Sequence, residues 1–208
     1  MKRALAYILA AITGPRRGFT LMLFDEGGFA VSIGLLLAVA FAWALTFLGW
    51  ALAGWEPWGT PWLAIPPDVY YGWETLFAVP VILLGWLLAS GFVQLMSRQL
   101  GGGGSFEATA RLLALSIAVC NFVLLLPALV LAVLAVTGVL DAEWWQEISR
   151  PGAAQSIVWF LGAVSMFWLG SLTTIAVRAA HKTRSRRSLL VAIPTVVLYH
   201  GFVLVFLR

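Results

Sequence analysis

Five long runs without a charged residue dominate the pattern of apolar and polar positions along this chain of 208 residues. The runs are Phe29–Gly54, Thr75–Ser97, Leu112–Leu140, Gly152–Val177 and Ser188–Leu207. About 20 helical residues, each rising 1.5 Å, cross the ~30 Å hydrocarbon core of a bilayer. Alternating strands of about 10 residues, which would indicate a membrane barrel, do not occur in the sequence. The pattern therefore predicts an all-α integral membrane protein with five transmembrane helices in one domain.

The segment 4–24, which precedes the first run, has a different pattern. Its apolar residues recur at the spacing of one helix face: Leu5, Ile8, Leu9 and Ile12. Basic residues flank this stripe, and such a helix lies flat in a membrane interface. A signal peptide also has a basic start and a short apolar core, but the expected small-x-small cleavage site is missing. We expect a short amphipathic interfacial helix rather than a sixth span.

Charge is divided unequally between the two sides that five alternating helices define. Eleven of the 13 Lys and Arg residues lie in the N-terminal segment and in the second and fourth connections, whereas six of the nine acids lie in the first and third. Basic loops stay in the cytoplasm. The N-terminus is therefore expected inside and the C-terminus outside, in the inner (plasma) membrane of a cell. The net charge of +4 serves this orientation, and nucleic acid is not an expected partner.

Tryptophan gathers at the ends of the runs that lie opposite the basic loops. The residues are Trp50, Trp55, Trp58, Trp62, Trp73, Trp144 and Trp145. Indole rings favour the headgroup level of a membrane, which predicts an anchoring belt. An aromatic cup that binds a substrate is the alternative.

Three polar side chains lie within the predicted spans, namely Gln94, Asn121 and His200. Asn121 is placed near the midplane, where an amide needs partners from neighbouring helices. His200 is interpreted as the one ionisable residue well inside a span. Such groups are candidates for proton transfer, but a neutral histidine bonded to a carbonyl, a tyrosine or water is the favoured interpretation because no carboxylate accompanies it at the same depth.

Small residues recur every four positions on two of the predicted spans. The first set is Gly34, Ala38 and Ala42, and the second is Gly85 and Ala89. Such ridges let helices approach closely in a membrane. They are expected to be packing surfaces.

Motifs that carry chemistry are not found. Cys120 is the one cysteine, so neither an intrachain disulfide nor a cysteine-based metal site is expected. The sequence has no GxSxG, no HExxH and no Walker lysine. We expect no enzymatic activity, no cofactor and no metal.

The second and third runs are joined by a glycine-rich turn, Gly101–Gly104, which raises the question of a slack tether or a fusion scar. We favour a capped turn. Gly101 is expected as the left-handed residue after one helix, and Ser105 as the N-cap of the next; Gly102, Gly103 and Gly104 complete the reversal. Free N–H groups beside Arg98 and Arg111 would suit a lipid phosphate.

These residues also carry a resemblance to a known family. The run LGGGGSF at 100–106, followed by RLLA at 111–114 and a span with Pro127, resembles the glycine-rich segment of the YIP family of Ypt/Rab-interacting, five-span membrane proteins. ITGP at 12–15 and Asp25-Glu26 also fit that family. Eukaryotic members have a longer N-terminal region that engages GTPases, so the resemblance implies a compact, prokaryotic-type relative.

The resemblance implies a non-enzymatic membrane scaffold or adaptor that binds other membrane proteins or organises lipid. Its expected partners are anionic lipids at the cytoplasmic face and other membrane proteins or further copies of the chain. The alternative is a small transporter or channel subunit for lipid or an apolar solute. A polar tunnel joining Asn121, Gln94 and His200 would favour transport, whereas a closed bundle with an exposed ridge of small residues would favour the scaffold.

Overall fold

The computed structural model describes residues 2–57, 63–150 and 152–207, and in these ranges it has eight α-helices. They are α1 (Lys2–Thr13), α2 (Pro15–Phe24), α3 (Gly28–Leu52), α4 (Pro67–Gln99), α5 (Phe106–Val136), α6 (Ala142–Ile148), α7 (Ala153–His181) and α8 (Ser185–Phe206). Five of them, α3, α4, α5, α7 and α8, are long and apolar enough to cross a membrane. The expected all-helical fold is thereby confirmed, and its five long apolar helices are consistent with five membrane spans.

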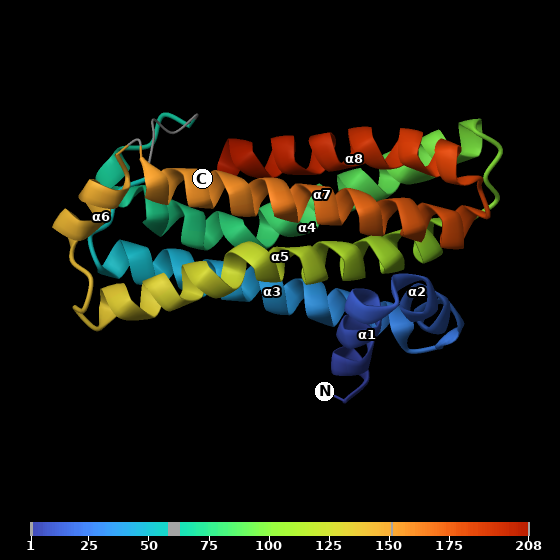
Figure 1. Cartoon of the computed structure of the whole chain (residues 1–208), viewed down its shortest axis with the longest axis horizontal. Coiled ribbons are helices and arrows are strands. Elements are labelled where there is room, and N and C mark those ends of the chain that lie inside the picture. Colours follow the sequence, from blue (N-terminus) through green and yellow to red (C-terminus); the bar gives the residue numbers. More distant parts are fainter. Residues whose placement is uncertain (1, 58–62, 151, 208) are drawn as a thin grey trace.

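The five long helices lie side by side in one bundle (Figure 1). Helix α3 packs on α4 and α5, α5 packs on α7, and α8 closes the bundle by packing on both α4 and α7. Helices α1 and α2 lie at one end with the α4–α5 and α7–α8 turns, which we call the basic end. Helix α6 and the C-terminal end of α8 lie at the other, which we call the aromatic end.

Helix boundaries differ from the charge-free runs at several positions. Helix α4 begins at Pro67, eight positions before the second run, because a proline at the first helical position needs no N–H partner. Helix α5 ends at Val136 rather than 140, and Gly138 with φ +73° follows it. Charged residues mark the ends of the apolar runs in the sequence, but a helix can continue past them.

The N-terminal segment forms two helices rather than the single interfacial helix that we expected. Pro15 begins α2 after Gly14, so the chain turns there and α2 packs back on α1. Gly18 lies at this contact, where an added Cβ would come within 2.9 Å of the Ala10 carbonyl carbon. Tyr7 and Ala11 are buried, whereas the predicted stripe residues Leu5, Leu9 and Ile12 are exposed.

Burial is concentrated in the half of α5 at the basic end. Every residue from Thr109 to Cys120 is buried, because α1 and α2 add a cover at this end to the long helices α3, α4 and α7. Large apolar side chains are exposed around the bundle, and Phe167 on α7 is 79% exposed. Such a surface suits lipid rather than water.

Candidate functional site: the basic end of the bundle

The glycine-rich turn is a capped structure. Gly101 has φ +84°, and its N–H donates to the Arg98 carbonyl at 3.0 Å while the Gly102 N–H donates to the Ser97 carbonyl at 2.7 Å. This pair of bonds is the Schellman arrangement that ends a helix. On the other side, the Ser105 hydroxyl accepts from the Ala108 N–H at 3.1 Å and caps α5.

His181, at the end of α7, joins the glycine-rich turn to α5. Its Nδ1 accepts from the Gly104 N–H at 3.2 Å. The neutral ring therefore carries its proton on Nε2, which lies 2.8 Å from the Thr109 hydroxyl. The side chain of Gln94 completes the cluster by donating to the Gly104 carbonyl at 2.9 Å and accepting from Thr109 at 3.0 Å. Three spans are thus held to one turn.

Arg111 anchors the N-terminal helix pair to α5. Its Nη1 donates to the backbone carbonyls of Met22, Leu23 and Asp25 at 3.0, 3.2 and 3.2 Å. Its Nη2 contacts Glu107 Oε1 at 2.6 Å, and the Arg111 side chain is 10% exposed. A guanidinium offers five donors in a fixed fork, which suits several acceptors at once.

Asp25, just after α2, links both N-terminal helices. Its carboxylate accepts from the Tyr7 hydroxyl and from the Gly27 N–H, and lies 3.6 Å from Arg3 Nη1. Two hydrogen bonds hold the pKa of Asp25 below its usual value; the one from Tyr7 has the larger effect and the one from the Gly27 N–H the smaller. Burial and the same hydrogen bond raise the pKa of Tyr7 to about 12.

The expected contact of a lipid phosphate with the glycine-rich turn stays a prediction, and the local geometry offers it few donors. The N–H groups of all four glycines already donate within the protein, those of Gly103 and Gly104 to His181. The guanidinium of Arg111 is committed to α2 and Glu107, while Arg98 is exposed.

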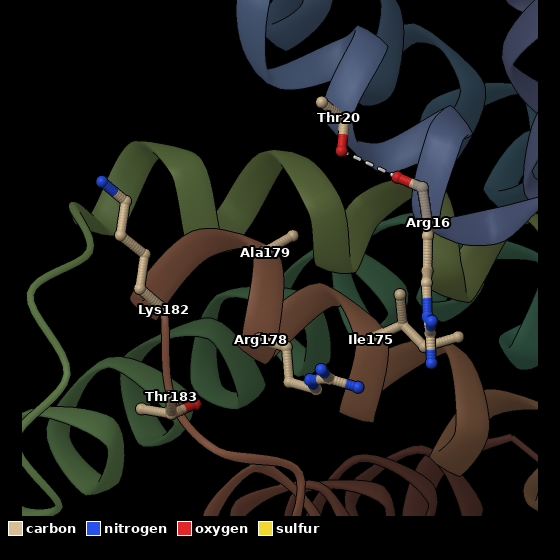
Figure 2. Close-up of a pocket in the computed structure, with 7 residues that line it drawn as sticks. All are labelled: Arg16, Thr20, Ile175, Arg178, Ala179, Lys182 and Thr183. Atoms are coloured by element: carbon tan, nitrogen blue, oxygen red, sulfur yellow. Dashed lines mark hydrogen bonds between the residues drawn. The ribbon is translucent and has the colours of Figure 1, made fainter.

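A cleft of about 350 Å³ opens between α2 and α7 at the basic end (Figure 2). It is lined by Arg16, Thr20, Ile175, Arg178, Ala179, Lys182 and Thr183. Its lining thus carries three cations and no acid. Its residues come from segments that lie far apart in the sequence and meet only because α2 folds back on the bundle.

The other two polar residues predicted within spans lie apart from the basic end. Asn121 Oδ1 accepts from the Trp43 indole at 2.8 Å, and its amide donates to the Ile117 carbonyl at 2.8 Å. His200 Nδ1 lies 3.1 Å from the Val196 carbonyl, one turn earlier in α8. Each is bonded within its own surroundings.

The two predicted small-residue ridges have different surroundings. On α4, Ala89 is fully buried, and a Cβ at Gly85 would lie 3.3 Å from the rings of Tyr199 and Phe202 on α8. On α3, Gly34 and Ala38 are exposed and Ala42 is half-buried. A Cβ at Gly34 meets no heavy atom within 4 Å.

Much of the tryptophan belt is an internal stack rather than an anchor. Trp50, Trp55 and Trp145 are at most 8% exposed, and the rings of Trp55 and Trp145 stack with centroids 4.2 Å apart. Trp73 is 46% exposed, in keeping with an interfacial position. Trp58 and Trp62 lie outside the described residues. The α3–α4 connection and α6 are joined through this stack, which needs no substrate to account for it.

The sequence analysis does not anticipate the structural positions of Glu74, Arg111 and His181. His200 is not the only ionisable side chain inside a span, because Glu74 on α4 and Arg111 on α5 are 1% and 8% exposed. Both were assigned to connections, since the spans were delimited by charge. The sequence places His181 in a basic run, and it carries no signal for the contact of this residue with the glycine-rich turn 77 positions away.

A bundle of five apolar helices, each long enough to cross a membrane, defines a multi-pass membrane protein. The Yip1 domain model matches residues 9–207, so the chain belongs to the Yip1 family, as the resemblance in the glycine-rich segment indicated. Members of this family are generally non-enzymatic membrane proteins. No curated protein and no solved structure matches the chain.

Proposed function

We propose that this Yip1-domain protein is a non-enzymatic scaffold of the cell's inner membrane, which binds other membrane proteins or further copies of itself and organises lipid at its basic end. Its basic end faces the cytoplasm, following the charge distribution. The observation that carries the proposal is the exposed pair of small residues on α3, Gly34 and Ala38. It stands against an interior in which Gln94, Asn121 and His200 each have a separate hydrogen-bond partner.

The interior gives no support to a transport path. Among the described residues, no hydrogen bond links any two of Gln94, Asn121 and His200, and each has a partner elsewhere. The two clefts at the basic end are lined by none of the three. A transport route would need polar groups that face a common space.

The surface of α3 supports lateral association. Gly34 and Ala38 are exposed and one turn apart, so a second helix can approach the α3 backbone closely there. In a membrane this approach contributes packing contacts that lipid chains do not supply.

A photo-crosslinking residue at position 38, in native membranes, tests the scaffold. Position 91 on α4 is the matched control, because Gly91 is also exposed and a Cβ there meets no heavy atom within 4 Å. We expect discrete protein adducts from position 38 and mainly lipid adducts from position 91. Identical lipid adducts at both positions would refute the proposal, and solute flux in proteoliposomes of the purified protein would replace it with transport.

A further inference from the structure

The cleft between α2 and α7 has the composition of an anion site. We propose that it binds the phosphate of an anionic lipid headgroup, with the Arg16 and Arg178 guanidinium groups as the principal ligands. This inference rests on the proposed function and names the lipid chemistry that the basic end would recognise.

The cations of the cleft form no ion pair with any residue that the structure describes. In the described part of the chain, the ion pairs join Arg3 to Asp25 and Arg111 to Glu107, so neither involves a cation of the cleft. Arg178 is half-buried and therefore less screened by water than a fully exposed side chain. An anion between these side chains would relieve their mutual repulsion.

The arginines lie on opposite walls of the cleft. In Figure 2 the Arg16 side chain extends from α2 toward α7, and the Arg178 guanidinium reaches into the same gap, whereas the Lys182 ammonium points outward. Planar guanidinium forks match phosphate oxygens in pairs, and a lysine acts as a point charge. We therefore assign the direct contacts to the two arginines and long-range attraction to Lys182.

The hydroxyl groups of the cleft are already used. Thr20 Oγ1 donates to the Arg16 carbonyl at 2.8 Å, as Figure 2 shows. Thr183 Oγ1 shares a hydrogen bond of 2.7 Å with the Ser188 hydroxyl. Recognition therefore depends on charge and on the guanidinium forks rather than on hydroxyl donors.

The depth of the cleft favours a lipid over a soluble phosphate. Arg178 and Lys182 lie at the end of the apolar helix α7, whose candidate span is Gln155–His181. Hydrocarbon gives way to headgroups at this level. On the adjoining face of α2, Leu21 and Phe24 are 52% and 85% exposed. Both residues line a second cleft, whose other lining residues are Arg3, Ala6, Tyr7, Thr20 and Asp25. The exposed side chains of Leu21 and Phe24 offer an apolar surface to the acyl chains of a lipid held by its phosphate.

The test compares two double variants that remove the same charge. Arg16→Gln with Arg178→Gln changes the cleft, whereas Arg184→Gln with Arg186→Gln changes exposed cations at the start of α8 that do not line it. Binding of phosphatidylglycerol to the full chain is measured by native mass spectrometry against a phosphatidylcholine background. The cleft variant should bind about tenfold more weakly, since charged hydrogen bonds are lost, and the control should change less than about twofold.

A third variant separates charge from geometry. Arg16→Lys with Arg178→Lys keeps both charges and loses both forks, so its affinity should fall between those of the parent and the glutamine variant. Melting temperatures in phosphatidylcholine should agree among all variants, because neither arginine makes an ion pair within the described residues.

Equal loss of lipid in the cleft and control variants would overturn the proposal in favour of a general basic surface. Inorganic phosphate and glycerol 3-phosphate form a second arm. If they bind as tightly as the lipid and compete with it fully, the site is one for soluble phosphate, which also overturns the proposal. Crosslinking from position 38 is read separately on the same variants. If protein crosslinking from position 38 persists when lipid binding fails the test, only the proposed lipid site is refuted. If the parent protein gives no protein crosslinks, the proposed scaffold function is refuted.

Discussion

Replacement of Gly104 by alanine tests whether the glycine-rich turn is packed closely against the end of α7. A Cβ at this position would lie 2.4 Å from the Ala180 carbonyl oxygen and 2.9 Å from His181 Nδ1. Real Cβ contacts are not this short, so the turn must move away from α7. That movement would break two hydrogen bonds of Gly104. Its N–H donates to the His181 ring, and its carbonyl accepts from the Gln94 side-chain amide.

The expected cost follows from these two effects. Overpacking costs about 1–3 kcal/mol, and each lost hydrogen bond costs about 0.5–1.5 kcal/mol. We therefore expect Gly104→Ala to lower the free energy of unfolding by about 3 kcal/mol. For a chain of this size the melting temperature would fall by about 6–12 °C. Thermal unfolding in detergent, followed by circular dichroism, measures it.

Gly103→Ala is the control, because a Cβ there meets no heavy atom within 4 Å, and it should change stability by less than about 0.5 kcal/mol. Gly101→Ala should cost about 1 kcal/mol for its left-handed backbone, and Ser105→Ala about 0.5–2 kcal/mol for the lost cap. Equal melting temperatures for the variants at 103 and 104, together with a harmless duplication of GGGGS, would show that the run is a slack tether.

Three further outcomes are expected. A reporter active only in the cytoplasm should work after Arg187 and fail after Arg208, and activity at both positions would contradict the assigned orientation. Asn121→Leu should lower the melting temperature more than His200→Phe, since it leaves the partly buried Trp43 indole N–H without its acceptor at a cost of about 1 kcal/mol; the reverse order would oppose the assigned roles. Because the folded-state pKa of Asp25 is lowered, docking of α1 should persist above the unfolded value of 3.8 and weaken as the pH falls through the lowered pKa. A fluorescent label on α1 reports it, and a signal independent of pH would show that this carboxylate does not hold the helix.

The parts of the fold that could be predicted depend on local rules. Membrane spans require long apolar runs, and each of the five runs corresponds to one long helix. The caps at Gly101 and Ser105 also follow from short-range backbone chemistry. The start of α4 at Pro67 escaped prediction because the span was delimited at the charge of Glu74, although this carboxylate is buried within the helix.

The parts that could not be predicted depend on contacts between distant segments. Arg111 binds carbonyl oxygens 86 to 89 positions away, and His181 binds an amide 77 positions away. No periodicity encodes such pairs. Arg111 looked like a loop cation with a free guanidinium, and only the return of α2 onto α5 supplies its acceptors.

The hydrogen bonds from Arg111 to α2 also determine which sequence changes this contact tolerates. Its three acceptors are main-chain oxygens, which every amino acid supplies, so the identity of the side chain at Leu23 is irrelevant to these bonds. Insertion or deletion of one residue in α2 would instead rotate the carbonyls by about 100° around the helix. Amino-acid substitutions in α2 should therefore preserve the hydrogen bonds from Arg111, whereas insertion or deletion of a single residue should break them.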